Sequence, residues 1–105
     1  MEVDLGVVRR VFEDVLSGAT SREQADRWAY TVMQNEETGV VTYMPPDERE
    51  RIWTAVMYLY GIDAMKAPGA YLHSSDDIRE AMVAILDGEG LQSADDDQNL
   101  RAALV

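Results

Sequence analysis

Apolar residues recur at i, i+3, i+4, i+7 and i+8 in four separate stretches of the chain, which is the spacing of a helix with one buried face. The pattern predicts helices over about 4–17, 21–37, 46–60 and 75–87. We therefore expect an all-α fold, a compact bundle of four main helices. The positions that should form its core are Val8, Val11, Phe12, Val15, Leu16, Ala25, Trp28, Ala29, Val32, Met33, Ile52, Ala55, Val56, Leu59, Tyr60, Ile78, Ala81, Met82, Ile85 and Leu86.

Residues that start or stop helices stand at the ends of these stretches. Gly18 follows the first stripe, at a position where a left-handed residue commonly ends a helix. Thr20 and Glu23 have the spacing of a capping box at the start of the second helix. Ser74 or Ser75 is expected to cap the fourth helix, since a hydroxyl accepts a hydrogen bond from a free amide of the first turn.

Two stretches fall outside the helical pattern. Residues 39–44 are rich in β-branched side chains and predict a short extended segment or hairpin, although one such segment makes no sheet alone. The stretch from 92 to 105 is polar and acidic at first and ends in apolar residues, so we expect it to be only partly ordered. The predicted organisation is a single helical domain over 1–91 and an acidic tail over 92–105.

The charge of the chain is its strongest compositional signal. The 20 Asp and Glu outnumber the 9 Lys and Arg, for a net charge of −11 on 105 residues. A charge of this size favours association with a basic partner. Binding to nucleic acids and anionic lipid surfaces rests on cationic side chains that neutralise phosphates, so the composition predicts neither a nucleic-acid nor a membrane partner.

The composition also bears on compartment. There is no Cys, which excludes a disulfide framework and a cysteine nucleophile and fits a reducing environment. No apolar run approaches the roughly 18 residues of a membrane span, and the first residues carry carboxylates where a secretory signal carries positive charge. We therefore expect a cytoplasmic location.

Residues that carry catalysis or bind metals are scarce. His73 with Asp76 and Asp77 is the one metal-like cluster, and it is better explained as part of a helix start. A nucleophile elbow and a phosphate-binding loop are both missing. The sequence thus predicts no catalytic residues, no metal, no cofactor and no enzymatic activity.

Surface residues remain as candidates for binding. A carboxylate at the end of a helix is disfavoured by the helix dipole, so acids there suggest a use outside the helix, whereas those at a helix start are already explained by the dipole. Tyrosines off the helical stripes or in loops are either core-edge residues or interface anchors, and the sequence leaves both open. The predicted partner-binding residues are Glu36, Glu37, Tyr43, Tyr58, Tyr71, Asp76, Asp77, Asp87 and Glu89.

Three segments carry a resemblance to a known class of proteins. They read SREQADRWA over 21–29, ERIWTAV with YLYGID over 50–63, and PGAYLHSSDDIRE over 68–80. In overall pattern they resemble small acidic helical immunity proteins of bacterial toxin–immunity loci. That resemblance implies a partner, the cognate basic toxin domain, often a nuclease, which the chain would neutralise by steric and electrostatic blocking.

Two other functions stay open beside this one. A non-catalytic regulatory or adaptor module would recognise another basic protein through the same acidic surface. A small enzyme would rely on His73 with Asp77. Under any of the three functions the chain is expected to be a monomer or a weak homodimer. A modest apolar patch at Met44, Met57 and Tyr58 would serve self-association or a foreign partner equally well.

Overall fold

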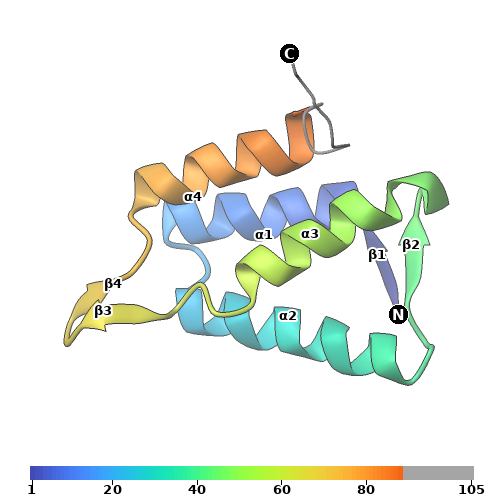
Figure 1. Ribbon diagram of the computed structural model, residues 1–105, viewed down its shortest axis with the longest axis horizontal. Coiled ribbons are helices and arrows are strands. Elements are labelled where there is room, and N and C mark those ends of the chain that lie inside the picture. Colours follow the sequence, from blue (N-terminus) through green and yellow to red (C-terminus); the bar gives the residue numbers. More distant parts are fainter. Residues whose placement is uncertain (89–105) are drawn as a thin grey trace, which may run out of the picture.

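Figure 1 shows the computed structural model, which describes residues 1–88 of the chain. Helices dominate this part, and two pairs of very short strands accompany them. In chain order the elements are β1 (Glu2–Asp4), α1 (Leu5–Ser17), α2 (Arg22–Glu37), β2 (Thr42–Met44), the 3₁₀ helix η1 (Pro46–Glu48), α3 (Arg49–Leu59), β3 (Met65–Ala67), β4 (Ala70–Tyr71), α4 (Ser75–Met82) and the π-helix η2 (Val83–Asp87).

The four predicted helices are present, with small differences at their ends. Gly18 ends α1 with φ of 86°, the left-handed conformation that its position predicts. The capping box of α2 lies one residue later than predicted, because Ser21 and Gln24, rather than Thr20 and Glu23, exchange the two capping hydrogen bonds. Ser74 caps α4.

The third and fourth helices are less regular than the periodicity predicts. The stretch 46–60 begins as the 3₁₀ turn η1, and the α-helix proper starts at Arg49. The stretch 75–87 is α-helical only to Met82 and continues as η2 to Asp87. Apolar spacing places both segments on the core but does not distinguish an α-helical turn from a tighter or wider one.

The strands correct the all-α prediction. Residues 42–44 of the predicted extended segment form β2, and its partner is β1 at the start of the chain, in parallel register with Val3 opposite Tyr43. A second pair, β3 and β4, forms an antiparallel hairpin that the helical pattern does not indicate, and Gly69 takes a left-handed φ of 78° in its turn. The fold is mostly helical rather than purely helical. The predicted tail over 92–105 lies outside the described residues.

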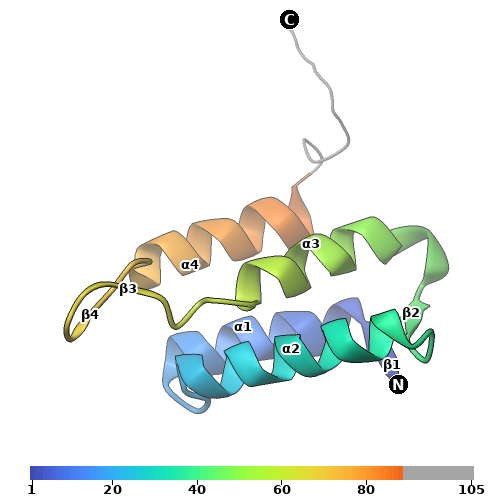
Figure 2. The same cartoon turned by 60° about the horizontal axis from the view of Figure 1, so that its bottom comes forward.

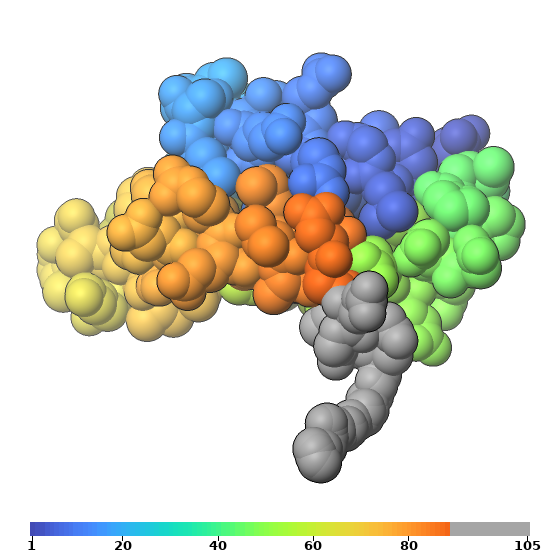
Figure 3. Space-filling model, turned by 90° about the horizontal axis from the view of Figure 1, so that it is seen from above, coloured from blue at the N-terminus to red at the C-terminus, as the bar shows by residue number. Residues whose placement is uncertain are grey.

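The helices form two layers, with α1 and α2 in one and α3 and α4 in the other (Figure 2). Seen from above, α4 and α1 occupy the visible face, and the β3–β4 hairpin projects at one end (Figure 3). Consequently α2 and α4 lie on opposite sides of the molecule (Figures 1 and 2).

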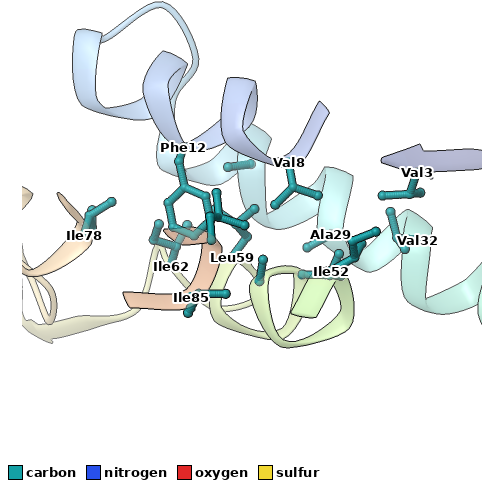
Figure 4. Packing of buried hydrophobic residues seen from close by; sticks show 14 of the residues in the cluster. Val3, Val8, Phe12, Ala29, Val32, Ile52, Leu59, Ile62, Ile78 and Ile85 are labelled. Carbon is teal, nitrogen blue, oxygen red and sulfur yellow. The ribbon is translucent and has the colours of Figure 1, made fainter. Parts of the chain in front are cut away.

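One hydrophobic core lies between the two layers. Phe12 of α1 points towards Leu59 and Ile62, and Val3 of β1 extends the core to the far end (Figure 4). These four side chains are fully buried, and burial of such apolar surface is the main stabilising contribution to a fold of this size. The other buried residues are Val8, Ala25, Ala29, Val32, Tyr43, Ile52, Ala55, Val56, Ile78, Ile85 and Leu86.

Candidate functional site

Two of the predicted partner-binding residues, Glu36 and Tyr43, bind each other. The Tyr43 hydroxyl donates a hydrogen bond of 2.6 Å to Glu36 Oε1, and Arg49 forms an ion pair of 3.0 Å with Glu36 Oε2. The Tyr43 hydrogen bond, followed by the contact with Arg49, lowers the pKa of Glu36, while burial and the same carboxylate raise the pKa of Tyr43. The three side chains therefore join the end of α2 to β2 and to the start of α3.

Tyr71 is held in a second group at the other end of α2. Its hydroxyl donates a hydrogen bond of 2.9 Å to Glu23 Oε2, and the Arg22 guanidinium lies 4.2 Å from the centre of its ring. The pKa of Glu23 is lowered by a hydrogen bond from its own backbone and then by the bond from Tyr71. Arg22 also donates to the carbonyl of His73 at 2.5 Å. This group attaches the β3–β4 hairpin and the following loop to the start of α2.

Tyr58 packs at the edge of the core. Its ring stacks on Phe12 at 5.9 Å and lies 5.2 Å from the ring of His73. Burial, followed by the charge of Asp77, raises the pKa of Tyr58. Tyr43, Tyr58 and Tyr71 are thus buried or half-buried side chains with partners inside the molecule.

The remaining predicted acids lie on different elements. Asp76 pairs with Arg79 at 2.8 Å, and Asp77 completes the capping box of α4. Asp87 pairs with Arg9 of α1 at 2.5 Å, and the hydrogen bond from Arg9 lowers the pKa of Asp87. Glu37 is exposed at the end of α2. Glu89 lies outside the described residues.

These residues do not come together at one place. The end of α2, with Glu36 and Glu37, and the start of α4, with Asp76 and Asp77, lie at opposite ends of the molecule (Figure 1). A contiguous acidic face built from the predicted residues is therefore absent from residues 1–88. Their role in binding stays a prediction, and their contacts within the fold already account for most of them.

A different surface stands out on α2. Between Gln24 and Gln34, the exposed side chains of this helix are Gln24, Arg27, Tyr30, Thr31 and Gln34, which we call the outer stripe. They lie opposite Ala25, Ala29 and Val32, which face the core. The outer stripe contains no carboxylate and one arginine. Sequence analysis, which singled out acids and loop tyrosines, missed it. A helical wheel of residues 22–37 groups these positions but places Glu23 among them, so only the structure shows that the exposed members carry no carboxylate.

Three acids of α2 outside the outer stripe are engaged in contacts within the fold. Glu23 and Glu36 are engaged by Tyr71 and Tyr43, and Asp26 Oδ1 accepts a hydrogen bond of 2.6 Å from the backbone N–H of Gly61. Among the other described helices, each has an exposed carboxylate, at Glu13, Glu50 and Asp76 for example. Arg27 makes no ion pair with another residue of the described part. The outer stripe is therefore a helix surface without an exposed carboxylate, although α2 has one beyond it, at Glu37.

Side chains that could carry catalysis or bind a metal do not gather within residues 1–88. No hydrogen bond joins His73 to Asp77 in residues 1–88, and no three metal-binding side chains converge there. A hollow of about 480 Å³ lies on the outer side of α4, lined by Asp76, Arg79, Glu80, Val83 and Ala84, which do not include a nucleophile with an adjacent base. None of the helices within 1–88 combines the length and apolar character that a membrane span requires.

Comparison with known proteins gives a family match and one curated relative. Residues 3–84 match a family model described as YxzC DNA-binding protein. The chain is 34% identical over 68 residues to a Bacillus subtilis (strain 168) protein named Uncharacterized protein YxzC. That alignment covers 65% of this chain and 50% of the relative, so the chain spans about half the length of the curated protein. No solved structure shows a significant match.

These matches overturn the function that the sequence patterns suggested. The family found is described by DNA binding, so the resemblance to toxin-immunity proteins and the cognate toxin as partner are wrong. The expectation of no nucleic-acid partner is contradicted by the same description. That expectation treated the net charge of the chain as a property of every surface, whereas binding at one surface depends mainly on the charges near it.

Proposed function

The chain belongs to the YxzC DNA-binding protein family, and we propose on that premise that it is a non-catalytic module that binds DNA through the outer stripe of α2. The observation that carries the choice of surface is the absence of carboxylates among the five exposed side chains from Gln24 to Gln34. The side-chain types fit the ligand, because Arg, Gln and Thr donate hydrogen bonds to phosphate oxygens and to base edges.

Arg27 supplies the positive charge of this contact. It is exposed at the middle of the outer stripe, with Thr31 one turn later on the same side of α2. The nearest carboxylate along the helix, Glu23, is half-buried and accepts a hydrogen bond from Tyr71. Glu23 keeps its negative charge and attracts Arg27, but it forms no ion pair with the Arg27 guanidinium in residues 1–88, so the guanidinium can still contact a phosphate.

The acidic remainder of the molecule weakens binding without preventing it. The structure measures 40 × 34 × 21 Å, and the Debye length is about 8–10 Å at physiological ionic strength. The exposed acids of α4 lie on the far side of the molecule from α2, so their repulsion of DNA at the outer stripe is largely screened (Figures 1 and 2). We expect modest affinity with a shallow dependence on salt.

The test is a titration of fluorescently labelled DNA with the full chain, followed by fluorescence anisotropy, for the wild type and two charge-matched variants. Arg27→Ala should weaken binding several-fold and reduce the slope of log K against log salt by about 0.7 to 0.9, the value for one phosphate contact. Arg79→Ala removes the same charge from α4 and should leave both quantities unchanged. Equal behaviour of the two variants, or no binding by the folded wild type at about 50 mM salt, would refute the proposal.

A second candidate is a regulatory module that binds a basic protein. The observation that favours it is the set of exposed acids on α4, at Asp76, Asp77 and Glu80, on the side away from the outer stripe. The two candidates are compatible, because they use different surfaces. Both keep the cytoplasmic location and the non-enzymatic role that the sequence predicts.

A further inference from the structure

Two exposed tyrosines form an aromatic pair beside the outer stripe. Tyr30 of α2 and Tyr60, which follows the last residue of α3, have ring centres 6.4 Å apart and ring planes within 22° of each other. Their exposed fractions are 48% and 46%, so about half of each residue is open to solvent. A pair of nearly parallel, half-exposed rings is a surface on which another flat ring can stack.

The pair is held in place by contacts on both sides. The Tyr30 hydroxyl accepts a hydrogen bond of 3.2 Å from Gln34 Nε2, within the outer stripe. Tyr60 is fixed through the next residue, because the Gly61 N–H donates a hydrogen bond to Asp26 of α2. The backbone that carries both rings is therefore held by α2 and by the Gly61 contact before any ligand arrives, which reduces the entropy lost on binding.

We propose that the Tyr30–Tyr60 pair stacks an unpaired base, so that the DNA bound by this chain is single-stranded. The inference rests on the proposed function and specifies its ligand class. In a duplex the faces of the bases are covered by their neighbours, whereas an unpaired base presents its face to aromatic side chains. Arg27 lies one turn before Tyr30 on α2, in position for the phosphate next to the stacked base.

The charge of the chain supports the same conclusion. Tight binding of a duplex usually depends on many cations that neutralise phosphates, and the outer stripe contains one arginine. Stacking of a base on an aromatic ring needs no cation and contributes substantially for each base. A net charge of −11 repels the phosphates of single strands as well as of duplexes, so stacking would have to supply most of the affinity.

The experiment compares a labelled single strand with the duplex of the same sequence. The wild type should bind the single strand more tightly. Tyr60→Ala should weaken single-strand binding about tenfold, in the lower part of the range for loss of one stacked base, and leave duplex binding unchanged. Tyr60→Phe keeps the ring and should bind like the wild type, while Arg27→Ala should weaken both ligands.

The outcomes separate this inference from the function on which it rests. If Arg27→Ala weakens binding while Tyr60→Ala has no effect on the single strand, or if the duplex binds more tightly, stacking is refuted and DNA binding stands. If the folded wild type binds neither DNA, the proposed function fails. Light scattering adds a further test, since a dimer that Tyr60→Ala converts to a monomer with unchanged DNA affinity would assign the pair to self-association and overturn the inference.

Discussion

Replacement of Tyr43 by Phe tests whether the contacts of Glu36 stabilise the fold. The substitution removes only the hydroxyl, which donates a hydrogen bond of 2.6 Å to Glu36 Oε1, and keeps the buried ring. Glu36 retains its ion pair with Arg49. The variant therefore isolates one hydrogen bond to a charged acceptor between α2 and β2.

The magnitude follows from the type of bond and its exposure. A hydrogen bond to a charged group contributes about 1.5–3 kcal/mol. The side chain of Glu36 is 29% exposed, so water replaces part of the lost interaction. We expect a loss of about 1 to 1.5 kcal/mol in the free energy of unfolding at neutral pH, which for a domain of this size lowers Tm by roughly 5–10 °C.

The pH dependence provides a sharper check. The pKa of Glu36 is lowered in the folded protein, so its stabilisation is fully present above the unfolded value of 4.5 and is lost as the pH falls through the folded value. The difference in unfolding free energy between the wild type and Tyr43→Phe should therefore shrink below about pH 4.5.

Urea denaturation followed by circular dichroism, over a range of pH values, measures this difference. Tyr30→Phe is the matched control, because its exposed hydroxyl accepts only a 3.2 Å bond from Gln34 and should matter little. A Tyr43→Phe variant as stable as the wild type at pH 7, or a loss that persists unchanged at low pH, would contradict the reasoning.

Two further predictions concern Val3 in the core and Gly61 after α3. Val3→Ala should lower the free energy of unfolding by about 2 kcal/mol, because the fully buried valine of β1 loses two methyl groups from the core. The control Val40→Ala, at a residue 52% exposed, should change the urea midpoint little. Gly61→Ala should lower the free energy of unfolding by about 1–2 kcal/mol, since Gly61 has a left-handed φ of 85° that strains a residue with a Cβ. Gly6→Ala, in the first turn of α1, should change stability little, because the helix propensity of alanine is offset by a Cβ only 3.3 Å from the capping Oδ1 of Asp4. Equal effects of the two alanines in thermal unfolding would argue against backbone strain at Gly61.

Much of the helical framework could be predicted because its signals are local. The stripe of α1, its C-terminal Gly18 and the cap at Ser74 depend on residues a few positions apart. The strands could not be found in this way, since β1 has only three residues and its partner β2 lies about forty positions later. The change from α4 to the π-helix η2 leaves the apolar spacing intact and is likewise invisible in the pattern.

The candidate site was harder to predict than the helices, because it depends on which charged side chains already have partners within the fold. Glu36 at the end of a helix was expected to face a partner, yet Tyr43 and Arg49 bind it within the fold. Conversely, Tyr60 was expected in the core and is 46% exposed beside Tyr30. A count of acids gives the sum of the charges but not the surface on which each one acts.

The sequence by itself determined the four helical stretches, the residues that end α1 and cap α4, and most of the core, because these follow from periodicity and from hydrogen bonds between near neighbours. Only the tertiary structure decided which side chains of α2 are exposed and which have partners within the fold. Acids of α2 are engaged by distant residues, as Glu23 is by Tyr71 across 48 positions and Asp26 by Gly61 across 35. Such contacts depend on how the elements pack, so the acid-free outer stripe and the tyrosine pair beside it become visible only once the chain is folded.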